Sequence, residues 1–178
     1  REHTVQFGVL GIDIASEGPF KTGGKATYLF NYRYSTLGLL QPLLPAHSGL
    51  PVYQDLSFKL NFPNKYGSIS VWGIGALDNM QKGQISDSSK WENENSRSGL
   101  DWTLNMGAIG ITNKLFLGTQ TWINTTVAGS GTLNQMEMNR FDNNLITRPN
   151  WLLVDNSGKI VFSTYMNHKF SKRNTLKT

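Results

Sequence analysis

The 178-residue sequence contains no cysteine, so it has neither a disulfide framework nor a thiolate that could bind a metal or act as a nucleophile. It also has no long hydrophobic run. The longest apolar stretches, 37–44 and 151–154, fall far short of the roughly 18 residues that a membrane-spanning helix needs. These absences exclude a helical membrane protein, but not a membrane barrel, whose strands need only about 9 to 11 residues each.

Charged residues are also few, at 16% of the chain, and the 17 basic residues that outnumber 12 acidic ones are scattered. A nucleic-acid-binding surface would normally show a basic stripe or cluster, so we expect no nucleic-acid partner. The one dense basic run, 169–177, is expected to be a solvated turn. The chain is 38% hydrophobic and 11% aromatic, which is too apolar for a disordered protein and enough for one domain.

Hydrophobic residues alternate with polar ones at a period of two along most of the chain. In 25–34 (KATYLFNYRY) the even positions are apolar or aromatic and most of the odd ones polar, which predicts a strand with one apolar face. No segment keeps a helical period. We expect strands at 5–15, 25–34, 54–62, 68–77, 100–108, 119–128 and 160–170, with an eighth beginning in 174–178. A slip of the apolar parity near Val9 is interpreted as a bulge.

Short and long connections take turns between these strands, the long ones being 35–52, 78–98 and 129–158. The pattern predicts an all-β fold, an antiparallel up-and-down meander of about seven to eight strands with every long loop at one end. Outer-membrane barrels have short turns on one side of the membrane and long loops outside.

The apolar strand faces carry too much aromatic and aliphatic area to remain in water, so a second sheet or lipid must cover them. Strands of about ten residues fit an apolar band about 25 Å tall when they tilt by about 40°, which favours lipid. The side chains expected to face lipid are Tyr28, Phe30, Tyr32, Leu56, Phe58, Leu60, Trp102, Leu104 and Phe162. Those expected to face a hydrated lumen are Arg33, Asp55, Lys59, Asp101 and Lys159.

Seven or eight strands with one apolar face form an open sheet, whose unpaired edges are not stable in hydrocarbon. The sequence also begins without Met or a signal-peptide pattern. We therefore expect residues 1–178 to be part of a larger transmembrane barrel.

Several strings resemble the barrel of large TonB-dependent receptors of Gram-negative outer membranes. They are GIDIASEGPF (11–20), KATYLFNYRYSTLGLL (25–40), YQDLSFKLNFP (53–63), SVWGIGALD (70–78) and FSTYMNHKFSKRNTLKT (162–178). The branch resembled has an N-terminal carboxypeptidase-regulatory-like domain ahead of the plug. The likeness covers nearly the whole chain except the loops at 79–97 and 130–157.

The resemblance implies a 22-stranded barrel in the cell outer membrane, with an internal plug that TonB pulls on to admit a small nutrient. Nothing in the chain matches the plug or the TonB box, so no coupling residue can be assigned. The implied partners are membrane lipid, the rest of the barrel and its plug, TonB through that plug, and a nutrient of unknown chemistry.

Catalytic and metal-binding patterns are weak throughout. The histidines lie far apart, the acidic residues of the loop at 78–98 lack the oxygen spacing of a calcium loop, and no serine sits in a nucleophile elbow. We expect no enzyme, no cofactor and no metal site. Trp91 and Trp151 are the candidates for ligand contact, although each could instead pack its own loop. The alternatives are a passive porin and a secreted β-sandwich that binds carbohydrate.

Overall fold

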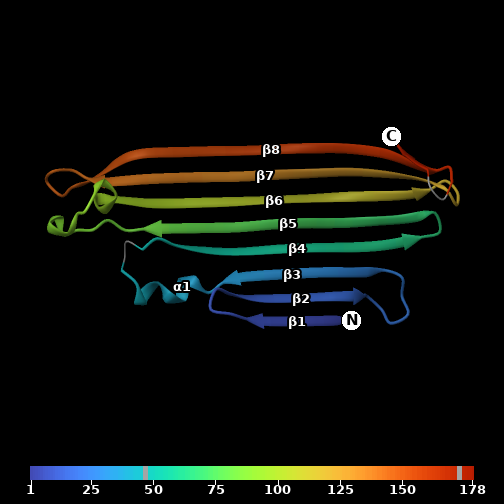
Figure 1. Cartoon of the computed structure of the whole chain (residues 1–178), viewed down its shortest axis with the longest axis horizontal. Coiled ribbons are helices and arrows are strands. Elements are labelled where there is room, and N and C mark those ends of the chain that lie inside the picture. Colours follow the sequence, from blue (N-terminus) through green and yellow to red (C-terminus); the bar gives the residue numbers. More distant parts are fainter. Residues whose placement is uncertain (46–47, 172–173) are drawn as a thin grey trace.

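The computed structural model describes residues 1–45, 48–171 and 174–178, and forms a single antiparallel sheet whose nine strands follow the order of the sequence (Figure 1). The strands are β1 (Glu2–Phe7), β2 (Gly11–Pro19), β3 (Thr27–Ser35), β4 (Leu50–Asn64), β5 (Gly67–Lys82), β6 (Ser98–Phe116), β7 (Thr121–Phe141), β8 (Thr147–Lys169) and β9 (Thr175–Lys177). Short helical turns are α1 (Leu37–Leu40), η1 (Gln41–Leu43), η2 (Ser88–Lys90) and η3 (Glu94–Arg97). None of the helices in the described parts is long and apolar enough to cross a membrane.

The prediction of an all-β antiparallel meander is confirmed. One of the predicted strands is divided into two. The segment expected as one strand at 5–15 is two strands, β1 and β2, joined by a tight turn. Gly8 N–H donates to Gly11 O at 2.9 Å and Gly11 N–H to Gly8 O at 3.3 Å. The parity slip at Val9 is therefore a chain reversal, and the interpretation as a bulge is wrong.

The loop expected at 129–158 is also wrong, because most of it is strand. β7 runs to Phe141 and β8 starts at Thr147, so only 142–146 remain as a connection. The glycine-, serine- and asparagine-rich stretches 129–132 and 155–158 resemble loops in composition. They pair with one another instead, with Gly131 opposite Gly158. Cross-strand pairing here outweighs the low strand propensity of these residue types.

The connections fall at two ends of the sheet, which we call the loop end and the turn end. The loop end carries 8–10, 36–49, 83–97 and 142–146, and the turn end carries 20–26, 65–66, 117–120 and 170–174. Only two loop-end connections are long, so the strict alternation of short and long connections is not observed. The basic run 169–177 contributes the end of β8 and all of β9, and its residues 172–173 lie outside the described part of the chain.

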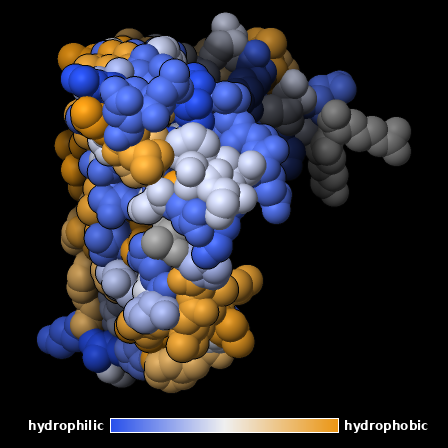
Figure 2. All heavy atoms as spheres, turned by 90° about the vertical axis from the view of Figure 1, so that its left-hand side faces the viewer, coloured by the Kyte–Doolittle hydropathy of each residue, from blue (hydrophilic) through white to orange (hydrophobic). Residues whose placement is uncertain are grey.

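The sheet has no second layer, and no large hydrophobic side chain of the described residues is buried. The accessible surface is 12224 Å², whereas a compact monomer of this mass would expose about 8,700 Å². Viewed from the loop end, hydrophobic residues extend down one side of the sheet, on the left in Figure 2. This fold leaves about 3,500 Å² more surface exposed than a compact domain would.

Candidate functional site: the two faces of the sheet

Strand register assigns each side chain to a face, because directly opposed residues of antiparallel strands lie on the same side of a sheet. From β2 to β8 the register is uninterrupted up to a shift between Met138 and Asn139. One row of opposed residues therefore runs across the whole sheet. It consists of Ser16, Phe30, Phe58, Gly73, Ile109, Gly129 and Ile160.

We call the side of this row the apolar face. It carries most of the residues that the sequence pattern grouped together, namely Tyr28, Phe30, Tyr32, Leu56, Phe58, Leu60 and Phe162. Later strands add Val71, Ile109, Ile111, Val127 and Ile160 to the same side. Ile160 and Phe162 are 87% and 69% exposed, so nothing in the described chain covers this part of the face.

Trp102, Leu104 and Asp101 were each expected to share a face with a group of other residues, and each lies on the opposite face from that group. These three assignments are wrong. Trp102 and Leu104 lie opposite Met80 and Asp78, on the face away from Phe58, and Asp101 lies on the apolar face. The reason is that β6 continues to Phe116 and its apolar parity changes from even to odd after Ala108, although the register has no bulge. The strand expected from the sequence, 100–108, covers only the first half of β6, where the even positions are apolar.

The apolar residues form a band that crosses the rows obliquely. On β2 the apolar face carries Ile12 and then Ser16, whose rows reach Asn156 and Ile160 on β8. Of these two rows, the one nearer the loop end is apolar on β2, at Ile12, and the one nearer the turn end is apolar on β8, at Ile160. On β5 the band extends from Ile69 to Leu77 without a polar side chain on this face, a length of about 27 Å along the strand at about 3.4 Å per residue.

Aromatic rings cover glycines on both faces. A Cβ built on Gly73 would lie 2.5 Å from the ring of Phe58, and one built on Gly110 would lie 2.5 Å from the indole of Trp72. These glycines let a large ring lie flat over the neighbouring strand. The indole N–H of Trp72 also donates to Thr112 Oγ1 at 3.1 Å.

The opposite side, the polar face, contains Arg33, Asp55, Lys59 and Lys159, four of the residues expected to face a lumen. Cross-strand hydrogen bonds connect its polar groups. Arg33 Nε donates to Asp55 Oδ2 at 2.8 Å, and the guanidinium also lies 5.5 Å from the ring of Tyr53. Asn31 donates to Asp13 at 2.9 Å. These side chains are either paired across strands or, like Lys59 and Lys159, exposed, which suits a surface in contact with water or with another polar element.

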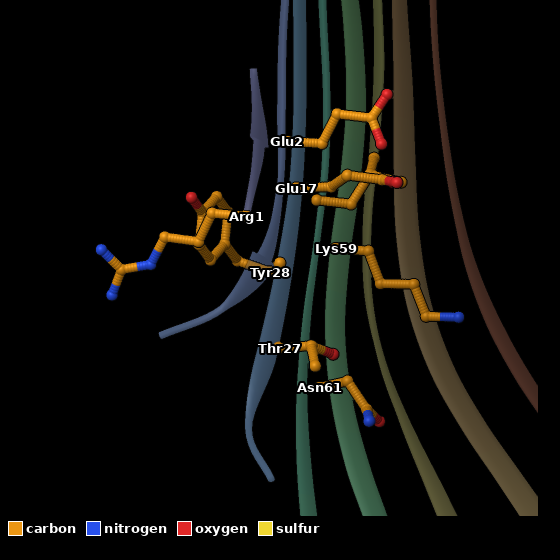
Figure 3. A pocket seen from close by; sticks show the side chains of 9 residues that line it. Arg1, Glu2, Glu17, Thr27, Tyr28, Lys59 and Asn61 are labelled. Carbon is orange, nitrogen blue, oxygen red and sulfur yellow. The ribbon is translucent and has the colours of Figure 1, made fainter. Parts of the chain in front are cut away.

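A hollow of about 640 Å³ opens on the polar face near the first strand (Figure 3). Glu2 and Glu17 are directly opposed partners there, and they point to the same side as Lys59 and Asn61. Arg1 points away, with its guanidinium donating to the carbonyls of Pro19 and Phe20. Two carboxylates, an ammonium and an amide can bind polar or charged groups, but they form no pair of nucleophile and base.

Trp91, one of the two residues proposed to contact ligand, packs within the loop end. Its ring stacks on Phe141 at 6.4 Å, Arg97 lies 5.3 Å from the ring, and the indole N–H donates to Ile85 O at 2.7 Å. Glu94 forms ion pairs with both Arg97 and Arg140. These contacts hold the long connection 83–97 against the β7–β8 hairpin, so they support the alternative that this tryptophan is structural.

Trp151, the other candidate, belongs to β8 and not to a loop, and it is 47% exposed on the polar face. It takes part in an apolar patch near the loop end, which spans β5 to β8. The patch consists of Met80, Leu100, Trp102, Met136, Met138, Trp151 and Leu153. Its three methionines were not predicted from the sequence, although Met136 and Met138 show the spacing of two residues that places them on one strand face.

Two aspartates at the loop end have a pKa below the ordinary value. The backbone N–H of Ile146 lowers the pKa of Asp142, with further hydrogen bonds from Asn144 and Arg148. Hydrogen bonds from the hydroxyl and backbone of Ser89 lower the pKa of Asp87. Both carboxylates cap short backbone turns, so these shifts have a structural cause.

No three acidic or histidine residues of the described chain are grouped so that they could hold a metal ion. The geometry offers an extended surface with one apolar and one polar face. A comparison with protein-family models, with curated proteins and with solved structures found no match.

Proposed function

We propose that the chain is a wall segment of a β-barrel that spans the outer membrane of a Gram-negative bacterium. Its apolar face contacts lipid and its polar face lines the interior. The observation that carries the proposal is a single sheet without a buried core, whose exposed hydrophobic residues form an oblique band.

The geometry of the band supports this proposal. Strands of membrane barrels tilt by about 35–45°, so a band parallel to the membrane must cross the hydrogen-bonded rows at an angle. One row of the sheet begins with the apolar Ile12 and ends with the polar Asn156. Another row begins with the polar Ser16 and ends with the apolar Ile160, as an oblique band requires. With a tilt of about 40°, the 27 Å stretch on β5 corresponds to about 21 Å across the membrane, close to the height of an outer-membrane apolar band.

The two sheet edges support a barrel larger than this sheet. Among the described residues, β1 has no partner strand on its outer side, and β8 is paired on its outer side only near its C-terminal end, at 166–169. Unpaired backbone N–H and C=O groups in hydrocarbon cost several kcal/mol each. Further strands would have to pair with these edges, and 22 strands is the number implied by the family resembled.

The resemblance given above places such a barrel in an energy-coupled receptor for nutrient uptake. In that assignment the polar face surrounds a plug, TonB acts on the plug, and the loop end faces the outside. The apolar patch around Trp102 and Trp151 then lies on the inner wall above the plug, where a nutrient would pass. Its chemistry favours a ligand with apolar or aromatic groups.

The test compares folding of the 178-residue chain in buffer and in detergent micelles. We expect the chain to be insoluble in buffer and to gain a β-sheet circular dichroism signal only when micelles are added, because the apolar face needs a hydrophobic partner. A cooperative thermal melt in plain buffer, with a sharp near-ultraviolet spectrum, would contradict the proposal and favour the soluble carbohydrate-binding sandwich.

A passive porin remains the second membrane candidate, since the two faces would be the same. The two candidates differ in whether uptake needs the proton gradient. Uptake by cells that carry the complete protein should stop when the proton gradient is collapsed if the barrel is TonB-coupled, whereas diffusion through a porin should continue.

A further inference from the structure

Basic residues gather at the turn end of the sheet. Those in the described chain are Arg1, Lys21, Lys25, Lys65, Lys114, Lys169 and Lys177. The acidic residues closest to this end are Glu2 and Glu17, both on the polar face. Apart from the run 169–177, the sequence showed no clustering, because these residues lie far apart along the chain and the meander brings them to one end of the sheet (Figure 1).

Basic residues at the two ends differ in their partners. At the loop end, Lys90 pairs with Asp87, Arg148 with Asp142, and Glu94 with two arginines. At the turn end, no ion pair to another described residue is formed. The lysines instead lie over aromatic rings, with Nζ 5.1 Å from the Tyr66 ring for Lys65 and 4.2 Å from the Tyr165 ring for Lys177. Lys114 lies 5.2 Å from the rings of both Phe116 and Trp122.

Two of the turn-end lysines lie just beyond the apolar band. Lys25 and Lys65 belong to turn-end connections, and each is three residues from an aromatic residue of the apolar face, Tyr28 and Phe62 respectively. Three residues of strand measure about 10 Å, or about 8 Å across the membrane at a tilt of about 40°. The polar headgroup layer on each side of the hydrocarbon is about 5–8 Å thick.

We propose that the turn end of the sheet binds the phosphate groups of anionic phospholipids, through Lys21, Lys25 and Lys65, in the membrane leaflet that surrounds it. The inference rests on the proposed function, since it needs the apolar face to be in lipid. The unpaired positive charge fits an anionic headgroup, and the Tyr66 ring beside Lys65 suits the membrane interface. The flexible lysine stems let the ammonium groups reach from the band to the headgroups.

The experiment measures flotation of the 178-residue chain, diluted from denaturant, with two kinds of vesicle. One kind is phosphatidylcholine alone, and the other is equal parts of phosphatidylcholine and phosphatidylglycerol. The test variant combines Lys21→Gln, Lys25→Gln and Lys65→Gln. The matched control removes three positive charges from the loop end, with Lys82→Gln, Lys90→Gln and Arg148→Gln.

We expect the unmodified chain and the loop-end control to bind the anionic vesicles more tightly, and high salt to remove the difference. Each basic residue near an anionic surface contributes about fivefold in binding, so the test variant should lose on the order of a hundredfold on anionic vesicles and little on phosphatidylcholine. Binding to both vesicles without a preference, or an equal loss in both variants, would overturn this inference alone. A failure to bind either vesicle would overturn the proposed function together with it.

Discussion

Adjacent residues in the middle of β6 offer the sharpest test of the two faces. Ile109 lies on the apolar face in the row of Phe58, and it is 59% exposed. Ala108 precedes it in the chain and lies on the polar face, opposite Ser130. The sequence alternation of 100–108 predicted the reverse, with even positions toward lipid. Ile109→Arg and Ala108→Arg therefore introduce the same charge one residue apart, on opposite faces.

The expected difference follows from the cost of placing arginine in lipid. A lipid-facing arginine near the midplane of a barrel costs about 2–4 kcal/mol, which reduces the folded-to-unfolded ratio by about 30-fold to 1,000-fold. Arginine at position 108 would meet the hydrated side, near Ser130 and Lys159. Repulsion from Lys159 in that solvated setting is worth well under about 1 kcal/mol, so we expect little effect on folding.

The assay is a urea titration of both variants after refolding in detergent or lipid vesicles, with the β-sheet circular dichroism signal as the readout. Ile109→Arg should lower the transition midpoint strongly, and Ala108→Arg should leave it close to that of the unmodified chain. If the two variants lose stability equally, or if Ala108→Arg is the worse, then the assignment of the faces is refuted.

Three further outcomes are expected. Gly110→Val should lower the free energy of unfolding by about 1–3 kcal/mol in the same titration, because the new Cβ meets the Trp72 ring. Gly131→Val should be tolerated, because a Cβ there lies 3.7 Å from the nearest atom. Equal losses in the two variants would contradict the packing argument. Leu145→Gly should stabilise the β7–β8 hairpin by about 1 kcal/mol, since Leu145 has a φ of 61°, and a loss of stability would refute the strain. Because the pKa of Asp142 is lowered, its carboxylate stabilises the hairpin at pH values above its ordinary pKa of 3.8, and this stabilisation is lost as pH falls through the lowered value. The amide-exchange protection factors of the hairpin, which correct for the pH dependence of intrinsic exchange, should then fall in the unmodified chain, and an equal fall in Asp142→Asn would refute it.

The sequence alone predicts the strand class and much of the first half of the sheet. Alternation in β3 and β4 is regular, and the residues assigned to one face there do lie together. The same reasoning failed on β6, where hydrophobicity changes sides at Ala108 while the backbone continues without a bulge. Alternation within a short window identifies a strand, but it relates one strand to the next only when the register between them is known.

What the residues determine by themselves is local: a period of two, the absence of a helical stripe, and enough aromatic area to require a hydrophobic partner. What the tertiary structure decides depends on pairing across the sheet. It joins the glycine-rich stretches of β7 and β8 into strands, places Trp102 with three methionines, and gathers the scattered lysines at one end. These features depend on register and topology, because hydrogen bonds between distant strands set which side chains become neighbours, and no stretch of the sequence contains that information.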